Sequence, residues 1–211
     1  EEMKRLIRAI KATALGDGST PYAYKIHFSN HSYKANGGWS FPDSIPIYNQ
    51  QIHFANRMQV TQVASRGNYY INDNTLPATY DSCMIISVGA SDANGNKMAL
   101  SCYGSGMDVI APGDTSIVQT ISRDTYYGKF SGTSAAAPFA SGVVALLMAH
   151  MNDSTDNYNN LAPEDCDYVI RHSATDVGPA GYDSINGQGR LNAGKALRMV
   201  EKPVRILYHY G

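Results

Sequence analysis

The sequence predicts an α/β fold built on a parallel sheet with helices on both faces. Residues Glu1 to Leu15 carry apolar side chains at helical spacing, and Tyr24 to Ser29 alternates apolar and polar residues as a strand does. Met84 to Ala90 is a continuous apolar run, typical of strands that are buried on both faces of a parallel sheet. Helix and strand patterns that alternate along one chain are characteristic of α/β proteins.

The composition describes a globular protein and excludes several function classes. The chain has 211 residues, the size of one domain that buries about 70% of its unfolded surface. Its formal net charge of −1 gives no reason to expect a nucleic-acid partner or an anionic membrane surface. No apolar run approaches the roughly 18 residues of a membrane span, so we expect no such span. Neither a Gly-x-Gly-x-x-Gly turn after a strand nor a Gly-Lys-Ser/Thr loop is present, which excludes a nucleotide-binding domain.

The remaining elements follow from local patterns. Pro46 lies at the start of a predicted helix that carries Ile52 and Ala55 on one side, and Pro163 opens another helix that ends near His172. The other expected elements are strands at Met58 to Ala64, Met107 to Ile110, Ser116 to Ile121, Tyr126 to Phe130 and Val204 to Tyr208, and a helix at Ala193 to Val200. The cysteines Cys83, Cys102 and Cys166 lack Cys-x-x-Cys spacing, so buried thiols are expected and one disulfide is left open.

The stretch from Phe130 to His150 indicates a reactive serine. Gly132, Thr133 and Ser134 precede small residues and then an apolar run, which predicts a loop that turns into a buried helix. Ser134 would lie at the helix N-terminus, where free N–H groups and the helix dipole favour negative charge on a reacting oxygen. The alternative is that Thr133 or Ser134 merely caps a core helix.

Sequence motifs in this stretch and near the C-terminus resemble those of a known enzyme family. Gly132 to Pro138, followed by Ala140 to Gly142, is similar to the nucleophile signature of the subtilases, the subtilisin-like serine peptidases. Gly187 to Ala193 is similar to the segment that closes the subtilase domain before its terminal helix. The resemblance covers about Glu1 to Val200 with its blocks in the family order, and it implies a three-layer subtilisin-like fold.

The resemblance also implies the residues of an active site. Ser134 would be the nucleophile, and Asn68, in a segment similar to the family's Ala-Ala-Gly-Asn, would donate its amide to the oxyanion. Lys34 stands where the family has glycine, which changes the shape expected for the specificity pocket. The residues implied to bind substrate are Ser32, Tyr33, Lys34, Ala64, Ser65, Arg66, Gly67 and Thr133. The match further implies a cis Leu76–Pro77 bond.

Two members of the subtilase triad do not occur in this chain. No Asp-Thr/Ser-Gly turn follows a buried strand, and none of the six histidines is followed by Gly-Thr. A serine hydroxyl needs an adjacent base that is itself oriented by a third group. No spacing supports His31 or His53 as that base. We therefore expect the chain to be inactive alone and to need a complementary N-terminal segment that carries Asp and His; the alternative is a non-catalytic peptide-binding module.

The same resemblance sets expectations for domains, ions and location. Residues 1–202 would form the C-terminal part of a subtilase catalytic domain with its N-terminal strands missing, and 203–211 a tail. Tyr24 to Ser29 would then be an exposed sheet edge that aggregates or pairs with another chain. The resemblance makes no cofactor certain, structural calcium is left open, and Asp108 alone does not make a cation site. The family implies a secreted or extracytoplasmic protein with polypeptide substrates; no signal peptide is visible in this chain.

Overall fold

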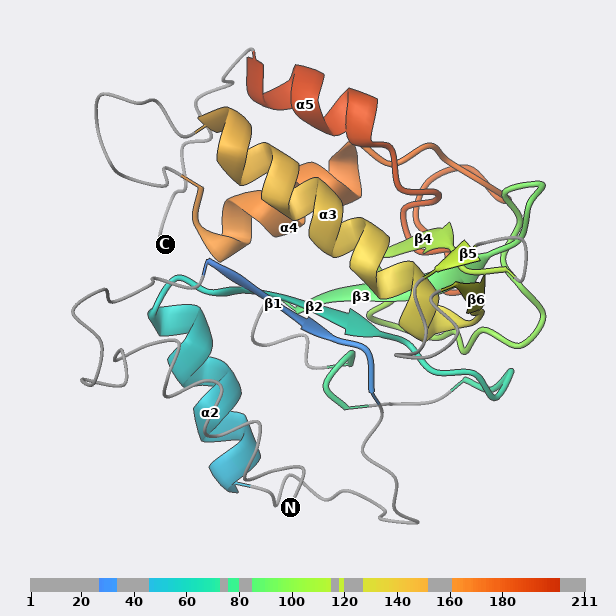
Figure 1. Cartoon of the computed structure of the whole chain (residues 1–211), viewed down its shortest axis with the longest axis horizontal. Coiled ribbons are helices and arrows are strands. Elements are labelled where there is room, and N and C mark those ends of the chain that lie inside the picture. The colour runs from blue at the N-terminus through green and yellow to red at the C-terminus, as the bar shows by residue number, and fades with distance from the viewer. Residues whose placement is uncertain are drawn as a thin grey trace.

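A four-stranded parallel sheet forms the centre of the computed structural model, which describes residues 27–33, 46–72, 76–79, 85–114, 118–119, 127–151 and 161–201. The strands lie in the order β1-β2-β3-β4 (Figure 1). Their bounds are Phe28–His31 for β1, Thr61–Ser65 for β2, Ile85–Ser91 for β3 and Val109–Pro112 for β4. All three neighbouring pairs run parallel, which confirms the predicted sheet. The helix expected at Glu1 to Leu15 and the strand expected at Val204 to Tyr208 lie outside the described residues.

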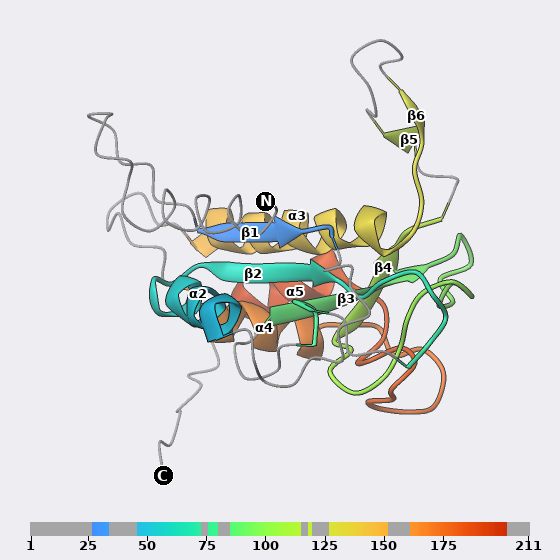
Figure 2. The same ribbon diagram turned by 90° about the horizontal axis from the view of Figure 1, so that it is seen from below.

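Helices cover both faces of the sheet and make three layers. On one face lie α3, Thr133–Met151, α4, Pro163–His172, and α5, Ala193–Glu201. On the other face lies α2, Pro46–Arg57 (Figures 1 and 2). A short antiparallel hairpin, β5 at Val118–Gln119 and β6 at Gly128–Lys129, lies apart from the sheet and delivers the chain towards α3. The arrangement confirms the predicted α/β fold.

Alternation along the strands divides the core between the two faces. In β2, Val63 packs in the large core against α3, whereas Ala64 packs with Ile52 of α2. In β3, Ile86 faces the α3 core and Ile85 the α2 side. Both strands are buried along their whole length, because successive side chains point to opposite faces and both faces are covered.

Strand boundaries shift from the predicted ones for a local reason. The predicted strand Met58 to Ala64 begins only at Thr61, because α2 continues to Arg57 and Gln59 then adopts a left-handed conformation with φ 62°. That turn reverses the chain between helix and strand. The Leu76–Pro77 bond is cis, as the resemblance implies. Cys102 and Cys166 are buried free thiols, and burial raises the pKa of Cys166 to about 11; Cys83 lies outside the described residues.

Helix α3 is the main packing element of the fold. It lies against all four strands and contacts both α4 and α5. Small residues on its inner face, Ala136, Ala137 and Ala140, are fully buried and let the helix axis come close to the sheet. Among the helices that the structure describes, α3 alone is long and apolar enough to cross a membrane, a property that its place in the core explains.

The neighbouring residues Leu146 and Leu147 provide a test of which face of α3 is core. Leu147 is fully buried, whereas the side chain of Leu146 is 51% exposed. We expect Leu147→Ala to lower the free energy of unfolding by about 2–5 kcal/mol, because it leaves a cavity between helix and sheet. The matched variant Leu146→Ala should change it by no more than about 0.5 kcal/mol. Urea unfolding of both variants measures the difference, and equal losses would contradict the assigned orientation of α3.

Candidate active site

Three chain segments meet at the N-terminus of α3. They are the residues that follow β1, the turn that follows β2, and the loop that leads into the helix. The Ser134 hydroxyl donates to the Ser32 carbonyl at 3.2 Å, and the Ser32 hydroxyl donates to the Ser134 carbonyl at 3.0 Å. This reciprocal pair joins the end of the edge strand to the first turn of α3. Both strands end at this edge because β1 and β2 are parallel.

Asn68 is held beside Ser134 by the residue that precedes the serine. The Asn68 Oδ1 atom accepts hydrogen bonds from the Thr133 backbone N–H at 2.9 Å and from the Thr133 hydroxyl at 3.0 Å. A backbone N–H can only donate, so the amide oxygen must be the atom that faces Thr133. The Asn68 Nδ2 group is therefore directed away from Thr133 and is available as a donor.

Thr133 acts as a relay between the two segments. Its side chain is fully buried, and its hydroxyl accepts from the Gly67 N–H at 3.0 Å while it donates to Asn68. The sequence resemblance placed Thr133 and Gly67 among substrate-binding residues. The structure shows the Thr133 side chain engaged with Gly67 and Asn68, and a substrate contact by Thr133 or Gly67 stays a prediction. Sequence reasoning missed this relay because it joins positions that lie 66 residues apart.

Two glycines allow the close approach on which this junction depends. Gly132 has a φ of 101°, and a Cβ there would lie 2.8 Å from the Asn68 side chain. The Gly132 N–H donates to the Gly113 carbonyl at 2.6 Å, and a Cβ on Gly113 would lie 2.7 Å from the Gly132 carbonyl oxygen. Only glycine fits at these two positions without moving backbone.

The turn that carries Asn68 has a second anchor. The Tyr69 N–H donates to the Cys102 sulfur at 3.3 Å, and the Tyr70 N–H donates to the Leu100 carbonyl at 2.9 Å. The Tyr69 and Tyr70 side chains themselves are exposed. Asn68 is thus fixed from two directions, by the start of α3 and by the segment that follows β3.

The predicted channel residues on the β2 side are buried. Ala64 and Ser65 are buried in β2, so only backbone atoms of this strand end could meet a ligand. Arg66 is fully buried as well, and its guanidinium donates to the carbonyls of the loop at residues 103–106, at 2.9 Å for Ser105. Its charge therefore does not line a groove. Lys34 lies outside the described residues.

His31 faces the side of the sheet opposite to α3. Its neighbour Asn30 accepts from Ser141 of α3 at 3.1 Å, and successive strand residues point to opposite faces. His31 Nε2 lies 3.0 Å from the Ser29 hydroxyl and Nδ1 lies 3.0 Å from the Tyr33 hydroxyl. The ring cannot serve Ser134 as a base from that face. Burial lowers the pKa of His31 to about 4, which keeps the ring neutral near pH 7.

No histidine within the described part of the chain is hydrogen-bonded to Ser134, whose hydroxyl pairs with Ser32. His150 lies at the other end of α3, 16 residues along the helix or about 24 Å away. His172, in the last turn of α4, is stacked on Tyr168 with the ring centroids 3.9 Å apart. Within the described residues, Ser134 and Asn68, the predicted nucleophile and oxyanion donor, thus lie at one junction with no histidine hydrogen-bonded to Ser134.

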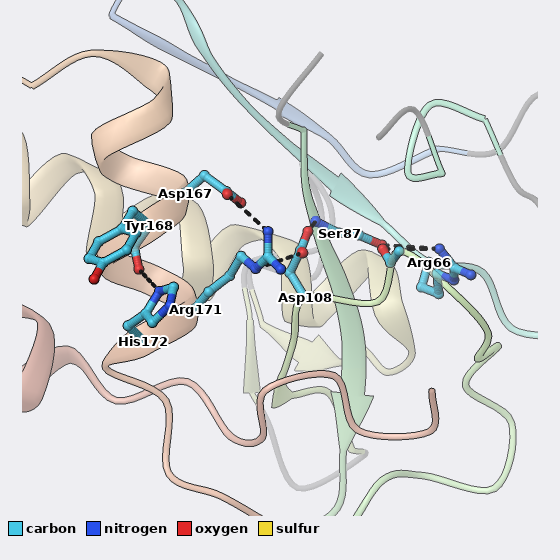
Figure 3. A network of polar contacts seen from close by, with 8 residues as sticks. Arg66, Ser87, Asp108, Asp167, Tyr168, Arg171 and His172 are labelled. Atoms are coloured by element: carbon cyan, nitrogen blue, oxygen red, sulfur yellow. Dashed lines mark hydrogen bonds and ion pairs between the residues drawn. The ribbon is translucent and has the colours of Figure 1, made fainter. Parts of the chain in front are cut away.

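Asp108 belongs to a polar network that links β3, β4 and α4 (Figure 3). Its Oδ2 accepts from the Ser87 N–H at 2.7 Å, and its Oδ1 lies 3.5 Å from Arg171 Nε. Arg171 also reaches Asp167 on α4, at 3.4 Å. A guanidinium therefore lies where a cation beside Asp108 would be sought. Among the described residues, no group of three or more His, Cys, Asp or Glu side chains could hold a metal ion, so calcium remains only an expectation.

The described residues bring together a hydroxyl and hydrogen-bond donors of the kind that acyl transfer uses. A serine hydroxyl lies in the first turn of a helix, where backbone N–H groups have no intrahelical acceptor. An amide donor lies beside it and is oriented by buried hydrogen bonds. Two such donors close to a nucleophile can stabilise the oxyanion of a tetrahedral intermediate.

Comparisons with known proteins match most of this chain. The family model described as "Subtilase family" matches residues 4–189. M-protease of Shouchella clausii strain KSM-K16 is 30% identical over 170 residues, which is 81% of this chain and 41% of that protein. Subtilisin BL of Lederbergia lenta is 29% identical over 170 residues, again 81% of this chain and 58% of that protein. The chain thus spans about half the length of these curated relatives.

A solved structure shows the same fold. The prenylagaramide maturation protease PagA superposes with a TM-score of 0.73 at 25% sequence identity, over 92% of this chain and 66% of that one. The similarity therefore extends to nearly the whole chain in three dimensions as well as in sequence.

The buried histidine makes the stability of the fold depend on pH. The unfolded chain binds a proton at His31 near pH 6.5, whereas the folded chain does so only near pH 4. Stability should therefore fall as the pH drops from 6.5 to 4, by about 3 kcal/mol at full protonation. We expect His31→Gln to flatten this part of the stability curve and the exposed-site control His150→Gln to leave it unchanged. Urea unfolding at several pH values measures it, and parallel curves for His31→Gln and the parent would refute the assignment.

Proposed function

Since this chain belongs to the subtilase family, we propose that it acts as a serine-type endopeptidase with Ser134 as the nucleophile. The observation that carries the proposal is the pairing of Ser134 with Asn68 through the buried Thr133 relay. A residue that merely caps a core helix would not need an oriented amide beside it. The match of the family model to residues 4–189 supports the same chemistry.

The proposed reaction proceeds through an acyl-enzyme. Ser134 Oγ attacks the carbonyl carbon of a peptide bond while a histidine base takes the hydroxyl proton. The resulting oxyanion receives hydrogen bonds from Asn68 Nδ2 and the Ser134 N–H. The protonated histidine then gives its proton to the leaving amine, and water releases the acyl group by the same steps. Substrate would lie extended between the ends of β1 and β2, with Ser32 and Tyr33 on one side and Ala64, Ser65 and the Arg66 backbone on the other.

The base and its orienting carboxylate would come from a complementary N-terminal segment that carries His and Asp. Among the described residues the Ser134 hydroxyl pairs with the Ser32 carbonyl, and His31 lies on the face of the sheet opposite to α3. Without a base the chain should be close to inert, since loss of the triad histidine in a subtilisin costs about 10⁶ in turnover. From the family we also propose a secreted or extracytoplasmic location.

Labelling by a fluorophosphonate probe tests whether Ser134 is activated. We expect the chain extended by the residues encoded upstream of Glu1 to react, the 211-residue chain alone to react little, and Ser134→Ala to abolish labelling of both. An extended chain that folds and stays unlabelled would overturn the peptidase proposal. The protein would then be a relative that binds peptides without cutting them.

The proposed oxyanion donor can be tested without breaking the relay. Asn68→Asp keeps an oxygen to accept from Thr133 but replaces the donor with an acceptor. We expect turnover of a peptide substrate by the extended chain to fall by at least about 10²–10³, the size of the loss known for a subtilisin oxyanion-hole asparagine, with little change in KM. Asn94→Asp, the same change in an exposed turn, is the control. Equal turnover in Asn68→Asp and the parent would remove Asn68 from the mechanism.

A further inference from the structure

A row of polar side chains follows one side of β1 towards Ser134. Ser29, His31 and Tyr33 occupy alternate positions, which places them on the face of the sheet opposite to α3. His31 Nε2 lies 3.0 Å from the Ser29 hydroxyl, and His31 Nδ1 lies 3.0 Å from the Tyr33 hydroxyl. We call these three residues the polar row of β1. It begins at a partly buried serine and ends at a tyrosine that is 36% exposed.

The alternate residues of the same segment face α3 instead. The Asn30 amide donates to the Ser32 hydroxyl at 2.8 Å, and Asn30 accepts from Ser141 of α3 at 3.1 Å. Ser32 is joined to Ser134 by the reciprocal pair of hydrogen bonds described above. One set of side chains therefore fixes the end of β1 to the start of α3, while the polar row occupies the other side of the same backbone.

His31 uses both of its ring nitrogens within the polar row. The residue is 3% exposed, and burial lowers its pKa to about 4, so the ring is neutral near pH 7. A neutral imidazole has one N–H donor and one acceptor nitrogen, and a hydroxyl can pair with either of them. Both ring nitrogens are thus satisfied at once. Removal of either hydroxyl would leave a polar atom of a buried ring without that partner.

Tyr33 is the member of the polar row that can meet a ligand. It directly follows Ser32, whose carbonyl accepts from the Ser134 hydroxyl. The Tyr33 hydroxyl lies against the buried His31, and the two rings meet edge to face, with centroids 5.6 Å apart and planes at 75°. Because the polar tip of the side chain is turned towards the histidine, the exposed part of the ring presents carbon atoms. The orientation of this apolar surface beside Ser134 is set by His31.

We propose that His31 is a positioning residue that holds the Tyr33 ring as an apolar wall of the peptide channel, and that the channel thereby prefers a large apolar substrate side chain at this wall. The inference rests on the proposed function, which places Tyr33 beside the bound peptide. His31 acts through the tyrosine, because its own ring is buried. The competing role is purely structural: His31 would stabilise β1, and Tyr33 would select side chains equally well without it.

Peptide binding measures this preference without the need for turnover. The probes are fluorescein-labelled octapeptides of alanine in which one position at a time is phenylalanine. They are bound to the Ser134→Ala form of the chain extended upstream of Glu1, and fluorescence anisotropy gives each affinity. The measured quantity is the ratio of the affinities for the best phenylalanine peptide and for the all-alanine peptide. We expect Tyr33→Phe and His31→Leu each to lower this ratio about threefold to tenfold, the size of the loss of one hydrogen bond.

The double variant His31→Leu/Tyr33→Phe separates positioning from stability. If His31 acts through the Tyr33 hydroxyl, the double variant loses no more than either single variant, whereas independent effects would multiply. The exposed-site controls Tyr182→Phe and His150→Leu should leave the ratio unchanged. Multiplied losses, or an unchanged ratio in Tyr33→Phe, would overturn the inference. Urea unfolding shows whether His31→Leu folds; if it does not, the ratio for Tyr33→Phe decides alone.

Fluorophosphonate labelling of the extended chain with Ser134 intact keeps this inference apart from the proposed function. A labelled chain whose affinity ratio ignores both substitutions would refute the role of His31 while the peptidase stands. A coupled loss of the ratio in a chain that is never labelled would refute the peptidase and leave the role of His31 in place. Failure of every peptide to bind would overturn the inference as well.

Discussion

The hydrogen bonds that tie Thr133 to Asn68 and Gly67 are the interaction on which the rest of the site depends. They join the first residue of α3 to the turn after β2, two segments that no regular secondary structure connects. The donor and acceptor are each buried or partly buried, so loss of one partner leaves the other unsatisfied at a cost of about 1–3 kcal/mol. The same bonds set the position of Ser134, the direction of the Asn68 amide and the closeness of Gly132 to both.

The two faces of the sheet carry different kinds of interaction near this junction. The α3 face is apolar, and there Val63, Ile86 and Val88 pack against the helix. The opposite face holds the polar groups at the strand ends, His31 and the guanidinium of Arg66. Because the strands are parallel, neighbouring residues in register share a face, so one shift of register would exchange these sets. Ser134 thus begins a helix that is backed by an apolar layer.

Local patterns predicted most of the described fold because each element is locally consistent. The apolar run near β3, the proline at the start of α4 and the small residues of α3 each specify one kind of structure. What the sequence could not reveal is the direction in which individual side chains point. Arg66 follows a buried strand and was predicted to line a channel. Its side chain instead points into the protein, where the guanidinium donates to the loop at residues 103–106. His31 alternates with Asn30 as a strand residue should, but nothing in the local pattern shows that its polar ring is buried and pairs with Ser29 and Tyr33. Gln59 delays β2 through a turn conformation that has no strong residue signal.

The motifs for Ser134 and Asn68 could be found from the sequence because each is short and contiguous. The hydrogen bonds that bring the two motifs together, from Thr133 to Asn68, could not be found because they join residues 65 positions apart. On the proposed function, these bonds decide which catalytic groups this chain supplies by itself. The chain by itself holds the nucleophile and an oxyanion donor already oriented by its own buried hydrogen bonds. A complementary N-terminal segment would then have to bring only the base and its carboxylate. Loss of the Thr133 hydroxyl would lower activity even in the presence of that segment, because the Asn68 amide would lose one of the two hydrogen bonds that orient it towards the oxyanion.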